Sequence, residues 1–211
     1  VRAAMSNQVE RGTGQSLSPL CVYCAAGWGS RPAYASAARA LGAAMGRRGI
    51  DLVYGGGKLG LMREVADAVM GAGGHVLGVI THDLKHKEVA HDAVSRMVVV
   101  ETMHERKKRM ADEARGFVAM PGGVGTLDEL FEILAWAQLG IHNRPVGLLN
   151  VEGYYDHLLS FIGHMEREGF LRVDPTKMIC VDTDPEALLD KMTRYEPLKR
   201  RSYEQRPGAG A

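Results

Sequence analysis

The stretch from Pro121 to Glu129 contains the residues of this chain that are best placed to do chemistry. It reads Pro-Gly-Gly-Val-Gly-Thr-Leu-Asp-Glu, and the apolar run before it, 117–120, is typical of a buried strand. Apolar residues then recur at 127, 130, 131 and 134, a spacing that predicts a helix. Glycines let a ligand approach the backbone closely, and N–H groups at a helix start bind anions. With the Glu129 carboxylate about one turn into this helix, the pattern predicts chemistry on a phosphorylated molecule.

Thr126 and Glu129 also have the spacing of a capping box, in which two side chains satisfy the N–H groups at a helix start. For the T-x-x-E pattern alone, capping is the more frequent explanation. A cap needs no glycine cluster, however, and Gly122, Gly123 and Gly125 precede it here. We therefore expect Thr126 to cap the helix while Glu129 faces the ligand.

Arg106 and Lys107 lie about one turn into a helix predicted over 103–114, near the same edge of the fold. The basic run continues with Lys108 and Arg109, which we expect on a solvated face. An arginine at this edge can clamp a phosphate or stabilise developing charge. By position alone, a solvated face and a place in the site explain Arg106 equally well.

Gly55-x-Gly57-x-x-Gly60 matches the dinucleotide-binding fingerprint between a predicted strand and helix. It follows the second strand instead of the first, and the nearest suitable acidic residue, Asp83, lies in a His/Lys-rich loop. We interpret it as a second loop of close approach in the same cleft, with a nicotinamide site as the less favoured alternative.

Two further groups of residues suggest chemistry only at first sight. His82, His86 and His91 share a polar loop, but nothing fixes them at ligand geometry, so we predict no metal site. Cys21 and Cys24 form a C-x-x-C motif inside an apolar run. Residues three apart on a strand point to opposite faces, so we expect two core cysteines and no redox pair.

Strand and helix patterns alternate along the chain, which predicts a single α/β domain: a Rossmann-like, doubly wound parallel sheet with helices on both faces. We expect a loose tail over 1–18, the domain over 19–196 and a second tail over 197–211. The predicted strands are 20–25, 51–54, 75–80, 97–100, 117–120, 146–149 and 178–181. The predicted helices are 32–47, 60–71, 103–114, the one containing 127–134, 154–168 and 185–194.

Composition narrows the class of protein. The 26 Lys and Arg residues nearly balance the 25 Asp and Glu residues, so no global positive field favours nucleic acid. The chain has no run of 18 apolar residues and no secretory segment near its start, so we expect neither a membrane span nor export. Three cysteines make no disulfide framework. These features favour a cytoplasmic protein.

Several motifs together resemble the "Lonely Guy" family of cytokinin-activating phosphoribohydrolases, over about residues 20–195. They are Val53-Tyr54-Gly55-Gly56-Gly57, Gly60-Leu61-Met62, Met103-x-x-Arg106-Lys107 and Pro121-Gly122-Gly123-x-Gly125-Thr126-x-x-Glu129. The resemblance implies a Rossmann-like homodimer without a cofactor. It implies hydrolysis of the N-glycosidic bond of N6-modified adenosine 5′-monophosphates, and AMP is a further candidate substrate. Some members carry a "lysine decarboxylase" label, but the chain shows no Schiff-base lysine or pyridoxal phosphate motif.

The resemblance also assigns roles by matching position. Arg106 and Glu129 would be catalytic. Residues that would hold the nucleotide are Glu88, Lys107, Gly122, Gly123, Val124, Gly125 and Thr126. The chain departs from the family at Cys24-Ala25-Ala26-Gly27, where Cys-Gly-Ser-Ser is common, so the preferred N6 group stays open. A non-catalytic nucleotide carrier of the same fold is the alternative, and the joint presence of Arg106 and Glu129 favours the enzyme.

Overall fold

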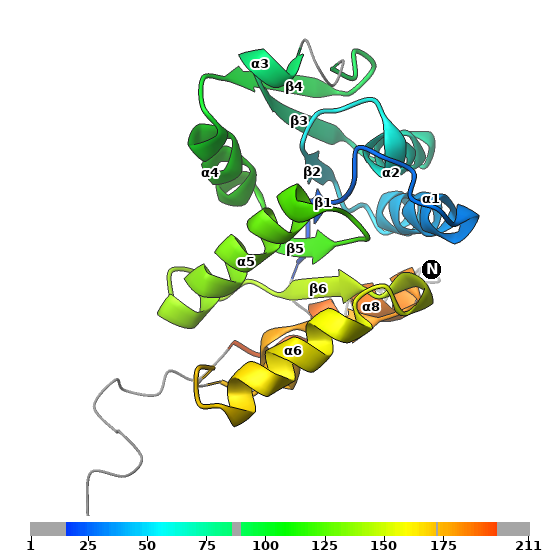
Figure 1. Ribbon diagram of the computed structural model, residues 1–211. Helices are drawn as coiled ribbons and strands as arrows, with labels where there is room; N and C mark the ends of the chain where they lie inside the picture. The colour runs from blue at the N-terminus through cyan, green and yellow to red at the C-terminus, as the bar shows by residue number, and fades with distance from the viewer. Residues whose placement is uncertain (1–15, 86–89, 172, 198–211) are drawn as a thin grey trace, which may run out of the picture.

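A seven-stranded parallel sheet runs through the computed structural model, which describes residues 16–85, 90–171 and 173–197 (Figure 1). The strands are β1 (Leu20–Tyr23), β2 (Leu52–Tyr54), β3 (Val76–Thr81), β4 (Arg96–Val100), β5 (Gly116–Ala119), β6 (Val146–Leu149) and β7 (Cys180–Asp182). The longer helices are α1 (Pro32–Arg47), α2 (Gly60–Gly71), α4 (Met103–Glu113), α5 (Val124–Leu139), α6 (Asp156–Arg167) and α8 (Pro185–Thr193). Short helical turns are α3 (His82–Leu84), η2 (Val151–Gly153) and α7 (Pro175–Met178).

The strand order is β4-β3-β2-β1-β5-β6-β7. The chain therefore winds outward from β1 to β4, returns to the centre at β5, and winds outward again on the other side. β1 pairs with both β2 and β5 in parallel, with Leu20 opposite Leu52 and Gly116. The order reverses between β1 and β5, and ligands of such sheets bind beyond the carboxyl ends of the strands at this point.

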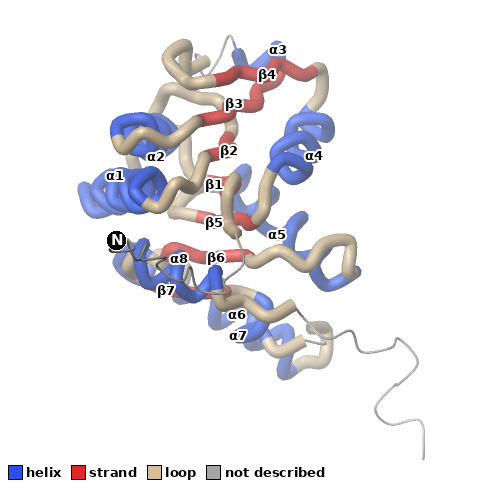
Figure 2. The backbone as a smooth tube through the Cα atoms, turned by 180° about the vertical axis from the view of Figure 1, so that it is seen from behind, coloured by secondary structure: helices blue, strands red, loops and turns tan. Residues whose placement is uncertain are grey.

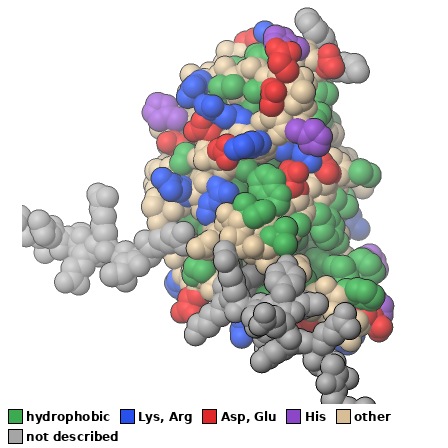
Figure 3. Space-filling model, turned by 90° about the vertical axis from the view of Figure 1, so that its left-hand side faces the viewer, with side chains coloured by type: hydrophobic (Ala, Val, Ile, Leu, Met, Phe, Trp, Pro, Cys, Tyr) green, Lys and Arg blue, Asp and Glu red, His purple; other side chains and the backbone are tan. Residues whose placement is uncertain are grey.

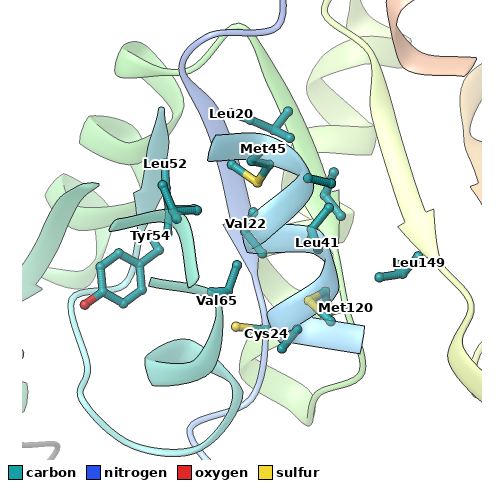
Figure 4. Packing of buried hydrophobic residues seen from close by; sticks show 14 of the residues in the cluster. Leu20, Val22, Cys24, Leu41, Met45, Leu52, Tyr54, Val65, Met120 and Leu149 are labelled. Atoms are coloured by element: carbon teal, nitrogen blue, oxygen red, sulfur yellow. The ribbon is translucent and has the colours of Figure 1, made fainter. Parts of the chain in front are cut away.

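Helices cover both faces of the sheet, as Figure 2 shows from behind. Side chains alternate along each strand, so one face of β1 sends Leu20 and Val22 into a core shared with α1, α2 and α8. The opposite face sends Cys21 and Tyr23 into a core shared with α4, α5 and α6. Figure 4 shows the first core, where side chains from α1 and α2 pack over the strands. These two apolar layers confirm the predicted doubly wound α/β fold.

The element boundaries differ from the prediction mainly at loops. The polar segment 81–95 contains the short turn α3, which Thr81 caps by accepting a hydrogen bond from Leu84 N at 3.3 Å. The helix predicted over 154–168 is preceded by η2 and starts at Asp156. Leu17 and Ser18, within the predicted first tail, pack on the domain: Leu17 is buried and Ser18 Oγ accepts from Asp51 N. Of the two predicted tails, residues 1–15 and 198–211 lie outside the described residues.

Candidate active site

A cavity of about 320 Å³ lies at the switch point between β1 and β5. The loops after β1, β2 and β5 and the first turns of α4 and α5 contribute its walls. The cavity is lined by Val22, Tyr23, Cys24, Ala25, Ala26, Gly27, Gly55, Met62, Met103, Arg106, Gly123, Gly125, Thr126, Asp128 and Glu129. The sheet edge thus brings together Arg106, Glu129 and the glycine loop, as the sequence predicted.

Arg106 is buried, so its side chain is not part of a solvated helix face. Its Nε donates to Val79 O and its Nη2 donates to Gly55 O, both at 3.0 Å. The third nitrogen, Nη1, lies 3.6 Å from Glu129 Oε1. Two backbone carbonyls therefore fix the plane of the guanidinium and leave one edge for Glu129 and the cavity.

Glu129 faces this guanidinium from α5, with 12% of its side chain exposed. Burial penalises an isolated carboxylate, and a nearby positive charge offsets that penalty. Arg106 is the cation that the structure places beside it. The pair forms a partly desolvated, fixed charge arrangement on the cavity wall.

The helix start is formed by the glycine loop itself. α5 begins at Val124, its N-cap residue is Gly123, and no side chain caps it. The first N–H groups of an α-helix have no partner within the helix. Gly123, Gly125 and Thr126 line the cavity, so this end of α5 and its dipole face the space where an anion would bind.

The predicted capping box is wrong. Because α5 begins at Val124, Thr126 lies inside the first turn and cannot be the N-cap. Thr126 is buried instead, and it packs so closely on Gly122 that a Cβ there would lie 2.1 Å from Thr126 Oγ1. Glu129 is therefore left without the capping role that competed with a chemical one.

The remaining predicted binding residues fall in different places. Lys107 Nζ lies 3.1 Å from Asp128 Oδ2 and 3.2 Å from Glu132 Oε1, beside the cavity and not in its lining. Although burial opposes it, hydrogen bonds to these carboxylates raise the Lys107 pKa, so the ammonium stays charged. Val124 is exposed, and Glu88 lies outside the described residues.

The second glycine loop, residues 55–60, is not arranged like a dinucleotide-binding fingerprint. At the start of α2, Leu61 N donates to Gly27 O and Met62 N donates to Ala25 O, both at 3.3 Å. These N–H groups are thus already used by the loop after β1. Gly55 lines the cavity and leaves room for Arg106, since a Cβ at Gly55 would lie 2.1 Å from Arg106 Nη2. The glycines of this loop therefore let other segments of the protein, and not a dinucleotide, approach the backbone closely.

The histidines and cysteines have structural surroundings. His91 Nε2 lies 2.8 Å from Asp67 Oδ1, His82 lies near Glu101, and His86 falls outside the described residues. No group of three or more His, Cys, Asp or Glu side chains is arranged for a metal in the described ranges. Cys21 and Cys24 are buried on opposite faces, as expected, and burial raises the pKa of both thiols.

Several residues of the cavity wall were not predicted as site residues from the sequence. Tyr23, Met62 and Met103 contribute apolar surface to the cavity lining. The loop Ala25-Ala26-Gly27, where the resembled family commonly has hydroxyls, also lines it. Asp128 was missed too, although it adjoins Glu129. Its position directly before the predicted carboxylate was the available signal.

Comparison with known sequences identifies a matching family and two similar proteins with the same described activity. A family model described as "Possible lysine decarboxylase" matches residues 62–192. A "Probable cytokinin riboside 5′-monophosphate phosphoribohydrolase" of Oryza sativa subsp. japonica is 47% identical over 197 residues, which are 93% of this chain and 87% of the relative. A cytokinin riboside 5′-monophosphate phosphoribohydrolase of Arabidopsis thaliana is 47% identical over 180 residues, or 84% of each chain.

Solved structures show the fold alone. The molybdenum cofactor carrier protein of Chlamydomonas reinhardtii superposes with a TM-score of 0.63 at 22% identity, over 84% of this chain and 98% of that one. A molybdenum cofactor binding protein from Rippkaea orientalis gives a TM-score of 0.61, also at 22% identity, over 82% and 94% of the two chains. This chain thus shares its fold with a molybdenum cofactor carrier, and the fold by itself does not identify a function.

The decarboxylase description does not fit the cavity. Pyridoxal phosphate enzymes hold their cofactor through a lysine Schiff base. The cavity lining contains no lysine among the residues that the structure describes, and the neighbouring Lys107 is engaged by two carboxylates.

Proposed function

The chain belongs to the Lonely Guy family, and we propose that it hydrolyses the N-glycosidic bond of cytokinin riboside 5′-monophosphates, which are N6-modified adenosine 5′-monophosphates. The observation that carries this proposal is the buried Arg106–Glu129 pair beside the open start of α5. The products would be the free base and ribose 5-phosphate. AMP is a further candidate substrate.

In the proposed reaction the C1′–N9 bond breaks, the base leaves with a proton, and water supplies the hydroxyl at C1′. The ribosyl centre acquires oxocarbenium character as the base departs, and a fixed carboxylate stabilises such a cation. Two carboxylates line the cavity: Glu129 is nearly buried beside Arg106, whereas Asp128 is exposed and pairs with Lys107, so Glu129 is the better placed for this role. We assign it the roles of stabilising this centre and positioning the water.

Arg106 has a narrower role than phosphate clamping. Two of its nitrogens are committed to Val79 O and Gly55 O, and the third faces Glu129. We propose that it keeps Glu129 ionised and oriented and that its cavity edge assists the departing base. The positive charge of Arg106 also stabilises the electron pair that the departing base takes from the C1′–N9 bond.

The 5′-phosphate is assigned to the start of α5, at Gly123, Gly125 and Thr126. Binding energy from this remote group fixes the sugar relative to Glu129. The apolar surface of the cavity, at Met62 and Met103, is assigned to the base and its N6 substituent. Lys107 and Glu88 remain predicted nucleotide ligands, and Lys107 lies beside the cavity, where it pairs with the lining residue Asp128.

We further propose a cytoplasmic homodimer. All three cysteines are free, which suits a reducing compartment. Among the described residues, no helix is long and apolar enough to cross a membrane.

The dimer is proposed from an exposed apolar stripe along α5, which consists of Phe131, Ala135 and Leu139. Figure 3 shows hydrophobic side chains together on the side where α4 and α5 lie. Such a stripe suits a second copy of the chain.

The test is release of free base, followed by chromatography. The protein is incubated with an N6-alkylated adenosine 5′-monophosphate, with AMP and with the matching nucleosides. We expect free base from the N6-modified monophosphate and none from the nucleosides. Equal turnover of the nucleosides would contradict the phosphate assignment, and absence of free base from every substrate would favour the carrier.

A further inference from the structure

The loop before α5 is held by two tyrosines that follow β6. Tyr155 Oη donates to Met120 O at 2.5 Å, and Tyr154 Oη donates to Gly122 O at 2.6 Å. Both acceptors belong to the segment that joins β5 to the helix start. The hydroxyl groups thus reach the glycine loop from a part of the chain that lies outside the cavity lining.

The carbonyl between these two is held as well. Pro121 O accepts a hydrogen bond from Ala25 N at 3.3 Å. Three consecutive carbonyls, from Met120 to Gly122, therefore each have a defined partner. Their orientation decides the orientation of the N–H groups that follow them, because a trans peptide is planar and its C=O and N–H point in opposite directions.

The peptide between Gly122 and Gly123 leads directly into the part of the loop that is assigned to the phosphate. Its carbonyl is directed to Tyr154, so the Gly123 N–H is directed away from Tyr154. Gly123 lines the cavity and Gly122 does not. Because neither residue of this peptide carries a side chain that limits its rotation, the hydrogen bond to Tyr154 acts directly on its orientation.

The position of Tyr154 is fixed by hydrogen bonds within its turn and by contacts of its ring. Asn150 Oδ1 accepts from Tyr155 N and Asn150 Nδ2 donates to Asp156 Oδ1, both at 2.7 Å, which closes the turn. The Tyr154 ring makes edge contacts with Tyr34 at 5.7 Å and with Tyr155 at 5.0 Å between centroids. The ring is thereby held without the hydroxyl.

Tyr154 and Tyr155 differ in what their hydroxyls serve. Tyr155 is fully buried in the core beneath α5 and α6, so its loss would affect packing as a whole. Tyr154 is 41% exposed, and its hydroxyl bonds to the loop alone among the described residues. We infer that Tyr154 is a positioning residue for the 5′-phosphate: it turns the Gly122–Gly123 peptide so that the Gly123 N–H donates to the ligand. This inference rests on the proposed phosphate site.

The test is Tyr154→Phe, which removes the hydroxyl and keeps the ring contacts. We expect the Kd of ribose 5-phosphate, measured by calorimetry, and the KM of the nucleotide each to rise about 3- to 10-fold, the order of one hydrogen bond. We expect kcat to stay within about twofold of the wild-type value. Tyr34→Phe is the matched control, because it removes a hydroxyl from the same aromatic cluster without touching the loop, and its Kd should not change.

The melting temperature separates positioning from global unfolding: Tyr154→Phe should melt within a few degrees of the wild type, the order of one hydrogen bond, and Tyr34→Phe should melt like the wild type. An unchanged Kd in Tyr154→Phe overturns the inference, and so does a fall in kcat alone. Absence of ribose 5-phosphate binding to the wild type overturns it as well. If the wild type binds ribose 5-phosphate but releases no free base, the proposed reaction fails while the Kd comparison still decides the role of Tyr154.

Discussion

Arg106 Nη1 lies 3.6 Å from Glu129 Oε1, and both side chains are largely buried in the cavity wall. Such a pair differs from a surface ion pair, because removing one partner leaves the other charge poorly solvated. The two residues come from α4 and α5, which follow β4 and β5. Their arrangement gives the first prediction.

Glu129→Gln should stay folded, bind nucleotide nearly normally and lose at least about a hundredfold in kcat. The neutral amide cannot stabilise a cationic ribosyl centre, and one electrostatic group of this kind contributes about 10²–10³ in turnover. Steady-state hydrolysis and calorimetric binding measure the two effects separately. Glu113→Gln, in a partly exposed pair with Arg109 and outside the cavity lining, is the control and should be near wild type. Turnover of Glu129→Gln within a few-fold of the wild type would remove Glu129 from catalysis.

Gly55→Ala should impair activity through Arg106. The added Cβ would lie 2.1 Å from Arg106 Nη2 and would displace the guanidinium from Gly55 O. We expect kcat/KM to fall by about tenfold or more, since small displacements of catalytic groups are costly. Gly71→Ala is the control, because a Cβ there has no atom within 4 Å. Equal activity of the two variants would show that the exact placement of Arg106 is unimportant.

The sequence was sufficient to predict the layers of the fold. Alternating strand and helix patterns predicted the parallel sheet, and the rule for ligands at its carboxyl edge brought Arg106, Glu129 and the glycine loop into one cavity. The surroundings of Arg106 were not predictable in this way. Its acceptors, Val79 O and Gly55 O, come from β3 and from the loop after β2, and their proximity depends on the strand order.

The start of α5 shows where a local pattern fails. T-x-x-E favours a cap at Thr126, but the glycine loop lets the helix begin earlier, with Gly123 as N-cap. Thr126 then becomes a buried contact of Gly122. The hydrogen bonds from Tyr154 and Tyr155 to the glycine loop could not be predicted from a local pattern either. Both tyrosines lie more than thirty residues away from the loop in the chain.

His142 should make the stability depend on pH. Its Nε2 lies 2.9 Å from Ile133 O and its Nδ1 accepts from Arg144 N, so the buried ring is neutral. Burial, chiefly, lowers the His142 pKa. The unfolded state, with a pKa of about 6.5, then binds more protons than the folded state, so stability is present above that pH and is lost as pH falls toward the folded pKa.

We expect urea unfolding at fixed protein concentration to show a loss of stability between pH 7.5 and pH 5.5. His142→Gln should be less stable at pH 7.5, by about 1–3 kcal/mol, and should show a flatter pH dependence. Both proteins contain the same carboxylates, so the difference between their pH profiles of unfolding free energy gives the contribution of His142. Parallel pH profiles for both proteins would contradict the assignment.

Leu139→Lys should convert the proposed dimer into a monomer. Leu139 and Ile141 are 58% and 64% exposed at the end of α5, and a charge there would be buried without a partner in a dimer. Analytical ultracentrifugation at micromolar concentration should give twice the chain mass for the wild type and the chain mass for the variant. Leu59→Lys, at the start of α2, is the control and should remain dimeric. A monomeric wild type would refute the dimer.

Gly122→Ala and Gly123→Ala should fail for different reasons, which makes them a direct test of the phosphate site. A Cβ at Gly122 would lie 2.1 Å from Thr126 Oγ1 and 2.7 Å from Thr126 Cβ. The first turn of α5 would have to shift, so we expect a lower melting temperature even without ligand. A Cβ at Gly123 has no atom within 4 Å, so Gly123→Ala should melt like the wild type.

The cavity side of Gly123 is where the proposed phosphate approaches the backbone. The added methyl group of Gly123→Ala would stand in that approach, and we expect the Kd of ribose 5-phosphate to rise about tenfold or more. The matching nucleoside lacks the phosphate, so its binding should change little and serves as the internal control. A Gly123→Ala protein that binds ribose 5-phosphate as tightly as the wild type would show that no phosphate approaches the backbone at Gly123, and the assignment of the phosphate to this residue would have to be abandoned.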